Sequence, residues 1–280
     1  MKGLVLEGGS MRGMFSAGIM DVFMENGIEF DGAVGVSAGA VFGCNYKSRQ
    51  IGRAIRYNKR FCNDPRYASF RSLIKTGDIY GADFCYRQIP DELDVFDTET
   101  FSKNPMDFYV VATDMDTGKP VYHKCKDGGK EDIEWMRASA SMPLVSRTVK
   151  IGNYSLSDGG TSDSIPVKFM IRKGYDKIVV ILTQPEGFVK KKNKLIPVIK
   201  MTMRDKPNFI KAISERHKMY NKTLACIKKL EESGRILVIR PPEALNIGAV
   251  EHNPDELERV YRLGRKVGEE YLGKVKEYLL

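Results

Sequence analysis

The sequence has few histidines and cysteines and no long apolar run, the features that most directly indicate a class of protein. It holds three histidines and five cysteines in 280 residues, and the cysteines are odd in number and widely spread, without a Cys-x-x-Cys pair. Cysteines placed in this way indicate reduced thiols, with neither a disulfide framework nor a zinc site. No apolar run approaches the roughly 18 residues of a membrane span, and the short run after Met1 is unlike a signal peptide. We therefore expect a cytoplasmic protein.

The positive charge of the chain is concentrated in one segment. The whole sequence carries a formal charge of +9, and the stretch Lys190–Lys218 holds ten Lys or Arg residues against two acidic ones. Such an asymmetry predicts contact with an anionic partner, either a membrane surface or a nucleic acid. The segment lacks the repeated aromatic residues on which a single-strand binder stacks bases. It therefore favours peripheral contact with an anionic membrane over binding of a nucleic acid.

The start of the chain contains two successive strand–turn–helix units. The apolar run Leu4–Leu6 is followed by the glycine-rich loop Gly8–Gly13 and by helical spacing over Met14–Asn26. Phe30–Val34 is typical of a second strand, and Ala38 can begin a second helix. Two units of this kind predict a parallel sheet with crossover helices, and hence an α/β protein.

Further elements are expected along the rest of the chain. The sequence of residues 44–94 predicts an insertion of short helices that could cover a site. Ser164 is expected to cap a helix that has Pro166 in its first turn and ends at Arg172. The other expected elements are strands at 107–113, 120–124, 177–182 and 235–240, a hairpin over 148–156, and helices at 131–141, 197–232 (broken at Pro207) and 254–280.

The stretch Val34–Ala40 is typical of a turn that presents a nucleophile. Ser37 is flanked, two residues away on either side, by Gly35 and Gly39. A tight bend from strand to helix lifts the serine hydroxyl clear of the backbone and leaves no room for side chains at those two positions. The start of the helix also favours a negative charge beside the serine.

The loop Gly8–Gly13 is the expected source of N–H donors for an oxyanion. Backbone N–H groups at a glycine-rich turn between a strand and a helix converge on one point. The same kind of loop also opens nucleotide-binding folds. This one lacks a Gly-Lys-Ser/Thr ending and has Ser10 at the middle glycine position of the dinucleotide pattern, which disfavours a nucleotide. Arg12 could stabilise the loop or meet an anionic head group.

None of the three histidines is placed as a catalytic base. His123 lies in an expected strand, His217 in the basic helix, and His252 just before Asn253-Pro254. A hydrolase of the Ser-Asp-His order would carry its histidine in a loop at the end of a late strand. A carboxylate that touches the serine directly is the remaining choice.

Two Asp-Gly-Gly triplets compete for that role. Asp127 lies between lysines in a polar run, as in an exposed turn, whereas Asp158 follows an expected strand and precedes an expected helix. The carboxylate of Asp158 can therefore be held by a fixed scaffold, and Gly159 and Gly160 let the chain turn sharply beside it. We expect Asp158 to be the base.

Four segments, in this order, resemble the patatin-like phospholipase family. They are the loop Gly8-Gly9-Ser10-Met11-Arg12-Gly13, the turn Gly35-Val36-Ser37-Ala38-Gly39, the stretch Arg137–Pro143 and the triplet Asp158-Gly159-Gly160. Ser10 stands where the family more often has glycine. The resemblance spans about residues 3–175, and the remainder is similar to the C-terminal extension of bacterial members.

The resemblance implies a fold and a set of roles. The fold is a three-layer α/β/α sandwich with a mainly parallel central sheet, related to the α/β-hydrolase plan. Ser37 would be the nucleophile, Asp158 the proton acceptor of a Ser-Asp dyad, and the loop Gly8–Gly13 the oxyanion hole, with no metal or cofactor. Residues 1–184 would form the catalytic domain, and residues 185–280 a mostly helical, basic extension packed on the same sheet.

These features predict a serine lipid acyl hydrolase of the phospholipase A, lysophospholipase or esterase type, acting through an acyl-enzyme intermediate. Two alternatives stay open: an acyltransferase on the same site, and a membrane-binding protein with a catalytically weak site. For Lys190–Lys218 the choice is between a docking face for anionic bilayers and a solvated face whose apolar positions pack on the sheet.

Overall fold

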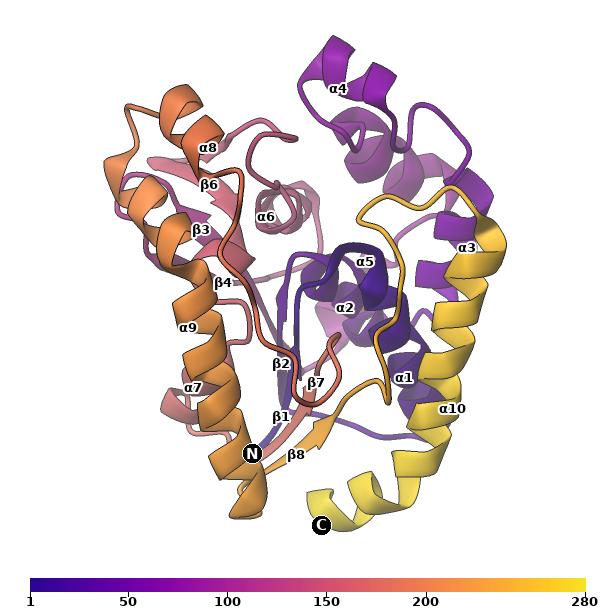
Figure 1. Ribbon diagram of the computed structural model, residues 1–280. Coiled ribbons are helices and arrows are strands. Elements are labelled where there is room, and N and C mark those ends of the chain that lie inside the picture. The colour runs from indigo at the N-terminus through magenta and orange to yellow at the C-terminus, as the bar shows by residue number, and fades with distance from the viewer.

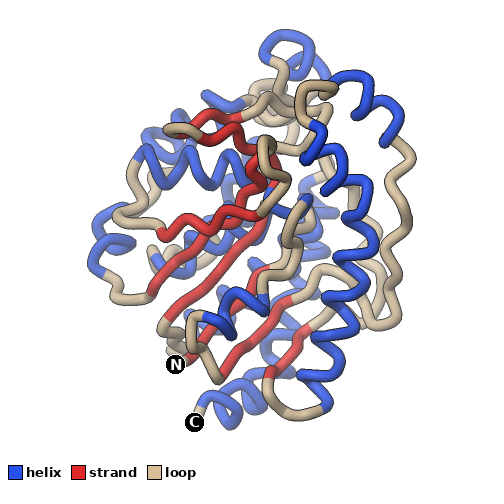
Figure 2. The backbone as a smooth tube through the Cα atoms, turned by 90° about the vertical axis from the view of Figure 1, so that its left-hand side faces the viewer, coloured by secondary structure: helices blue, strands red, loops and turns tan.

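The first strand of the chain lies in the middle of the sheet. The strands are β1 (Lys2–Leu6), β2 (Gly32–Val36), β3 (Asp107–Asp114), β4 (Pro120–Lys124), β5 (Val149–Ile151), β6 (Tyr154–Asp158), β7 (Lys177–Ile181) and β8 (Ile236–Ile239). In the computed structural model, which describes residues 1–280, β1 pairs in parallel with β2 on one side and β7 on the other. β3 and β8 extend the parallel sheet outward, and β4, β5 and β6 are antiparallel additions at the β3 end. Figure 2 shows the strands as one twisted sheet.

Helices cover both faces of this sheet. The α-helices are α1 (Gly13–Glu25), α2 (Ala38–Lys47), α3 (Arg53–Phe61), α4 (Phe70–Thr76), α5 (Thr98–Lys103), α6 (Lys130–Ser139), α7 (Val167–Arg172), α8 (Ile196–Thr202), α9 (Pro207–Glu232) and α10 (Pro254–Leu279). Short 3₁₀ turns lie at Ser10–Arg12 and Gly159–Thr161, and a π-helix at Phe84–Leu93. In Figure 1, α7 and α9 lie on one side of the sheet, and α1, α2 and α10 on the other.

The sheet separates two hydrophobic cores. Successive side chains of a strand point to opposite faces, so Leu4 and Leu6 of β1 belong to the larger core, whereas Val5 belongs to the other. The larger core includes Phe15 of α1 and Leu257 of α10, both fully buried. Two cores on the faces of one sheet make three layers, and this confirms the predicted α/β/α sandwich.

Helices α1 and α10 pack closely because glycines face each other at their crossing. A methyl group added at Gly18 would lie 2.2 Å from the carbonyl oxygen of Tyr261, and one added at Gly264 would lie 2.1 Å from that of Phe15. Next to this contact, the Tyr261 hydroxyl donates a 2.7 Å hydrogen bond to the buried carboxylate of Asp21. The C-terminal helix is therefore part of the main core, although it lies far along the chain from α1.

Strands β2 and β6 meet end to end along one edge of β3. β4 pairs with residues 109–113 of β3, so the partners of Ala112–Asp114 in β6 must lie on the opposite edge, where β2 pairs with residues 107–111. The last residue of β2, Val36, lies opposite Val111, and the last residue of β6, Asp158, lies opposite Ala112. Two strands that approach from opposite directions thus end at neighbouring positions of a third.

Most expected elements are present, with ends displaced by one to three residues, but one expected cap is wrong. The helix after Asp158 begins at Val167 with Pro166 as its N-cap, and no side chain caps it. The hydroxyl of Ser164 instead donates a 2.6 Å hydrogen bond to the carbonyl oxygen of Gly160. It therefore stabilises the turn after Asp158 and does not cap the helix. Residues 44–94 form the expected short helices. None of the helices is long and apolar enough to cross a membrane.

Candidate active site

Ser37 occupies the strained turn that the sequence predicts. It follows β2 and forms the N-cap of α2, with φ 54° and ψ −122°. A non-glycine residue with such a backbone is held there only when its surroundings enforce it. Here the space on both sides enforces it, because a methyl group at Gly35 would lie 2.3 Å from the carbonyl oxygen of Gly39, and one at Gly39 would lie 2.5 Å from that of Leu6. Ser37 itself is 8% exposed.

A second serine fastens the turn to the sheet. The backbone N–H of Ser37 donates a 2.8 Å hydrogen bond to Oγ of Ser139, whose hydroxyl donates to the carbonyl oxygen of Val111 at 2.5 Å. Ser139 is fully buried at the end of α6. Analysis of the sequence did not single it out, although it lies within the stretch Arg137–Pro143 that carries the family resemblance.

Asp158 lies beside Ser37, as the meeting of β2 and β6 requires. Its Oδ1 accepts a 2.8 Å hydrogen bond from the backbone N–H of Gly160, and the carboxylate is 6% exposed. Burial raises its pKa above the ordinary value, against the attraction of Arg216, the influence of the neighbouring Ser37 hydroxyl, the Gly160 N–H and the charge of Lys190. A carboxylate with a raised pKa in contact with a serine is suited to accept its proton.

The glycine loop Gly8–Gly13 lies against the nucleophile. A methyl group at Gly8 would lie 3.1 Å from Cβ of Ser37. The N–H groups of Gly8 and Gly9 donate to no protein acceptor, so they are available to an oxyanion. Ser10 has φ 49°, a backbone that favours glycine, which accounts for the glycine that the resembled family more often has there. Ser10 and Met11 line the cavity described below, together with Ser37.

Helix α9 reaches the site and contributes side chains that sequence analysis did not single out individually. Nε of Arg216 donates a 2.6 Å hydrogen bond to the carbonyl oxygen of Gly160. The hydroxyl of Tyr220 donates to the buried carboxylate of Glu7, which also accepts a hydrogen bond from the N–H of Thr183 at 2.6 Å. Glu7 directly precedes Gly8, so α9 holds both the oxyanion loop and the loop of Asp158. The signals for this in the sequence were the charge of the basic segment and the helical spacing of its apolar positions, which include Tyr220.

An apolar cavity begins at Ser37. Twenty residues line it and 16 of them are hydrophobic, so it suits a hydrocarbon chain better than a polar group. Part of the lining comes from the insertion 44–94, through Tyr57, Tyr86 and Ile89, and part from Val41 and Phe42 of α2. The insertion thus forms a wall of the cavity.

The histidines and Asp127 lie apart from this site. Nδ1 of His252 is 2.6 Å from the carbonyl oxygen of Cys62, and Asp127 is exposed in the loop before α6. His217 is half-buried on α9, and its Nδ1 has no hydrogen-bond partner. His123 stacks on the ring of Trp135, with centroids 4.5 Å apart, and bonds to Asp132. None of these groups forms a hydrogen bond with Ser37 or Asp158.

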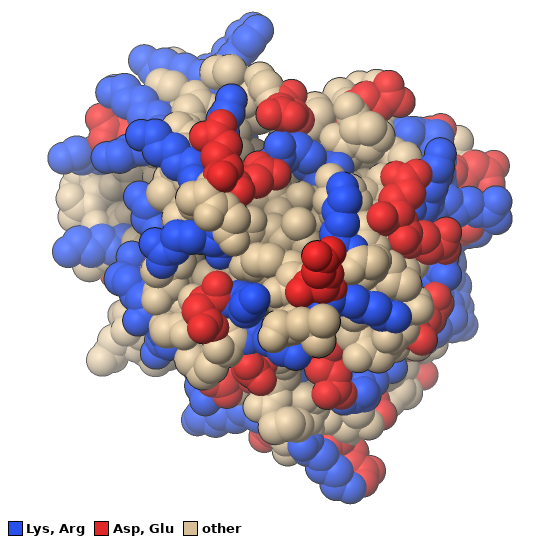
Figure 3. Space-filling model, turned by 90° about the horizontal axis from the view of Figure 1, so that it is seen from below, with Lys and Arg blue, Asp and Glu red and all other residues tan.

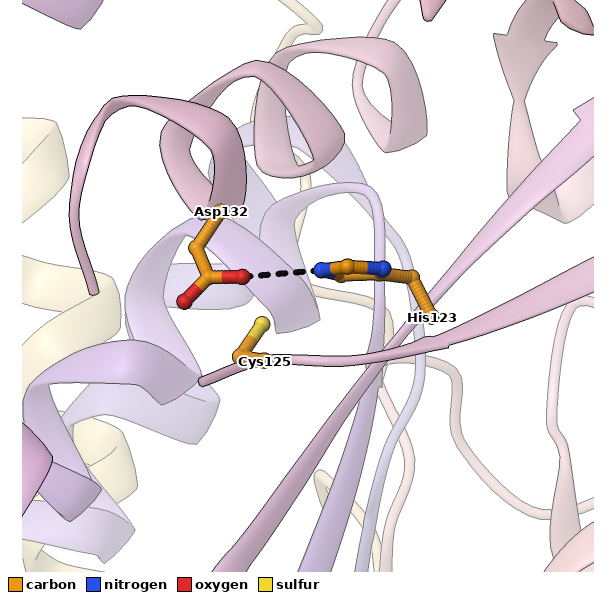
Figure 4. Close-up of side chains that lie close together, drawn as sticks. All are labelled: His123, Cys125 and Asp132. Carbon is orange, nitrogen blue, oxygen red and sulfur yellow. Dashed lines mark hydrogen bonds and ion pairs between the residues drawn. The ribbon is translucent and has the colours of Figure 1, made fainter. Parts of the chain in front are cut away.

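His123, Cys125 and Asp132 form the one cluster whose residue types could hold a metal ion (Figure 4). The carboxylate of Asp132 is already engaged, since one oxygen lies 2.8 Å from Nε2 of His123 and the other accepts N–H groups from residues 126–128. The cluster is therefore best described as a hydrogen-bonded anchor between β4 and α6.

Two family models match this chain. A family model described as patatin-like phospholipase matches residues 4–171, and one described as a domain of unknown function, DUF6363, matches residues 206–280. Uncharacterized protein YjjU of Escherichia coli (strain K12) is 28% identical over 298 residues, which cover 99% of this chain and 78% of that protein.

Two further proteins are more distant. Lysophospholipase nte1 of Aspergillus terreus (strain NIH 2624 / FGSC A1156) is 25% identical over 295 residues; the match covers 98% of this chain but only 18% of that much longer protein. Among solved structures, VipD from Legionella pneumophila has a TM-score of 0.46 at 12% identity, covering 98% of this chain and 67% of that one.

Proposed function

The chain belongs to the patatin-like phospholipase family, and from this premise we propose that it is a serine acyl hydrolase that cleaves fatty-acyl esters of lipids. The observation that carries the proposal is the juxtaposition of a strained, glycine-flanked Ser37 with Asp158 at the mouth of an apolar cavity. The relative from Aspergillus terreus, named a lysophospholipase, supports an ester of this class.

The proposed reaction uses two residues and one loop. Asp158 takes the proton of the Ser37 hydroxyl as its oxygen attacks the ester carbonyl carbon, and the carbonyl oxygen becomes an oxyanion. The unpaired N–H groups of Gly8 and Gly9 stabilise that charge. When the C–O bond breaks, the leaving alcohol takes the proton from Asp158. Water, deprotonated by Asp158, then attacks the acyl-enzyme, and the acid product and free Ser37 result.

We further propose that the protein docks on anionic membranes with the end of the molecule at which β1 and β2 terminate. Two short helices, α4 and α8, lie at that end on opposite sides of the sheet (Figure 1). Each exposes large apolar side chains: Phe70 (72%) and Ile74 (73%) on α4, and Met201 (61%) on α8. Exposed Lys and Arg residues accompany them on both helices.

This combination of apolar and basic side chains suits the boundary of an anionic bilayer. The opposite end of the molecule differs, since Figure 3 shows acidic and basic side chains intermixed over much of it. Docking through α4 and α8 would bring the mouth of the cavity to the lipid. The basic segment Lys190–Lys218 would then act together with α4, which sequence analysis did not connect with it.

The test of the hydrolase is a comparison of the wild type with Ser37→Ala on p-nitrophenyl esters and on monoacyl phospholipids, with the products identified by mass spectrometry. We expect free fatty acid from the wild type, none from the variant, and labelling of Ser37 by a fluorophosphonate. Acylated acceptor in place of fatty acid would mean an acyltransferase. Turnover that persists in purified Ser37→Ala would overturn the serine mechanism.

A further inference from the structure

Arg216 of α9 reaches the turn that carries the candidate base. Its Nε donates a 2.6 Å hydrogen bond to the carbonyl oxygen of Gly160, and the N–H of the same Gly160 donates a 2.8 Å hydrogen bond to Oδ1 of Asp158. A methyl group added at Gly160 would lie 2.8 Å from Nη2 of Arg216 and 2.9 Å from Oδ1 of Asp158. The guanidinium group and the carboxylate therefore border the same small space beside Gly160, where opposite charges attract each other.

The position of Arg216 follows from the way α9 is anchored. Four residues further along the helix, the hydroxyl of Tyr220 donates a hydrogen bond to the buried carboxylate of Glu7. Residues four apart on a helix lie on the same face, so the anchor at Tyr220 turns Arg216 toward the sheet. Arg216 is half-buried there, and its Nε is bound to Gly160. The fold thus brings a cation from a late helix to the end of β6.

Asp158 depends on a nearby positive charge to stay ionised. Its side chain is buried, and burial disfavours the charged form of a carboxyl group. Burial raises the pKa of Asp158, and the attraction of Arg216 is the largest of the influences that lower it again. The groups that act on this carboxylate are Arg216 of α9, the hydroxyl of Ser37, the N–H of Gly160 and the ammonium group of Lys190, which lies between β7 and α8.

Of the two cations near Asp158, Arg216 is the one whose charge does not depend on pH. Burial lowers the pKa of Lys190 to about 8. The positive charges of Arg216 and Arg12 act in the same direction, and the carboxylates of Glu7 and Asp158 oppose them. Lys190 therefore loses its charge as the pH rises above neutrality, whereas a guanidinium group is not deprotonated in proteins.

We infer that Arg216 is a positioning residue for the proposed reaction: it holds the turn of Asp158 through Gly160 and supplies the positive charge that keeps the carboxylate able to accept the Ser37 proton. The inference rests on the proposed function. A general base works best when its pKa lies near the working pH, and burial and Arg216 act on Asp158 in opposite directions. Arg216 lies outside the region that matches the patatin-like family, within residues 206–280. The C-terminal part of the chain would therefore take part in the reaction.

The test is the pH dependence of kcat/KM on p-nitrophenyl butyrate, a soluble ester that needs no membrane. Arg216→Gln keeps a hydrogen-bond donor but removes the charge, so the pKa of Asp158 should rise. The midpoint of the rising limb should move up by about one pH unit. Below both midpoints kcat/KM should be about tenfold lower than in the wild type, and above them the deficit should disappear. Arg216→Lys retains the charge and should retain the wild-type midpoint.

Two control variants separate the charge of Arg216 from its hydrogen bond and from the general charge of α9. Ser164→Ala removes the other hydrogen bond to the Gly160 carbonyl without changing a charge, so the midpoint should stay where it is. Lys222→Gln removes an exposed charge of α9 and should leave the whole profile unchanged. Arg216→Met, a second neutral variant in case Arg216→Gln does not fold, should show the same shift.

A profile of the neutral Arg216 variants that is lowered by one factor at every pH would overturn the inference, because a merely structural contact acts in that way. A midpoint of Arg216→Lys as high as that of the neutral variants would also overturn it. Failure of the hydrolase itself would appear differently, as a lack of fluorophosphonate labelling at Ser37 of the wild type.

Discussion

Ser139 joins Ser37 to strand β3: its Oγ accepts the backbone N–H of Ser37 and its hydroxyl donates to Val111. Val111 is also the residue of β3 that lies opposite the end of β2, one position before the partner of Asp158. A single buried hydroxyl therefore fixes Ser37 relative to β3. The same strand positions Asp158, because it pairs with β6.

Ser139→Ala should slow catalysis without removing a reacting group. The change leaves a buried N–H and a buried carbonyl unpaired, which costs about 1–3 kcal/mol in the free energy of unfolding, and it frees the turn that holds Ser37. We expect kcat to fall about tenfold and labelling by a fluorophosphonate to slow by a similar factor, both measured well below Tm. A loss of stability with an unchanged labelling rate would limit Ser139 to a structural role.

Asp158→Asn should abolish activity while stabilising the protein at neutral and alkaline pH. The variant lacks the base, so we expect a loss of about a thousandfold in kcat. The pKa of Asp158 is raised in the folded state even with Arg216 and Lys190 nearby, so the stability that its protonated form contributes is lost as pH rises through that pKa. Asparagine does not ionise, so the variant does not lose this stability as the pH rises.

Thermal unfolding of wild type and Asp158→Asn at pH 8 and at pH 4 checks the sign of this effect. The gain in Tm should be largest at pH 8 and should shrink toward pH 4. The wild-type kcat/KM should rise with pH through a value above the ordinary one of an aspartate. A variant that is less stable at pH 8 would contradict the assignment of burial as the dominant influence on this carboxyl group.

Val41→Phe should shorten the acyl chain that the enzyme accepts. Val41 lines the apolar cavity one helical turn beyond Ser37, and a larger side chain there takes space that a long chain would occupy. The ratio of kcat/KM for p-nitrophenyl dodecanoate to that for p-nitrophenyl butyrate should fall about tenfold. Parallel losses on both esters would indicate damage to the turn and not to the cavity.

Removal of apolar side chains from α4, or of basic side chains from α8 and the residues just before it, should weaken docking to vesicles. Phe70→Ser with Ile74→Ser, and separately Lys194→Gln with Lys200→Gln, should each reduce sedimentation with anionic vesicles. The basic pair should matter more at low salt because its contribution is screened. Lys228→Gln with Lys229→Gln, at the far end of α9, is the matched control. Equal vesicle binding by all variants at low salt would leave the basic segment as a solvated face.

Asp132→Asn should destabilise the protein mainly above acidic pH. Burial acts to raise the pKa of Asp132, but the hydrogen bonds from His123 and from three backbone N–H groups outweigh it, and the pKa lies below its ordinary value. A lowered pKa contributes stability above the unfolded value and loses it as pH falls through the folded one. The deficit of the variant in urea unfolding should therefore be clear at pH 7 and should narrow by pH 3.

The strand and helix pattern near the start was predictable because short local signals set it. Gly35 and Gly39 are required by contacts of 2.3 and 2.5 Å within one turn and with the adjoining strand, so the motif reports the geometry directly. Ser164 was assigned wrongly because a cap and a turn use the same hydroxyl, and the choice depends on the position of Gly160. The division of the chain at residues 184 and 185 stays a prediction.

The contributions of α9 could not be predicted residue by residue. Arg216 and Tyr220 reach the site only because a helix of 26 residues crosses the sheet at one particular place. Nothing in the sequence neighbourhood of Arg216 distinguishes it from the solvated residues of a basic helix, whereas Tyr220 falls among the apolar positions, at helical spacing, that were expected to pack on the sheet. The excess of positive charge was visible, but which lysine or arginine turns inward depends on packing against Glu7 and Gly160.

The position of β1 has a consequence for how the chain must be made. β1 is synthesised before the other strands of the sheet, yet one of its two neighbours, β7, begins only at Lys177, beyond the end of the region that matches the patatin-like family. A nascent chain that has reached Ile171 carries Leu4, Val5 and Leu6 along an unpaired strand edge, which is a template for aggregation. Trimming the protein to its family match would therefore not yield a minimal enzyme; it would leave the central strand of the sheet half-paired.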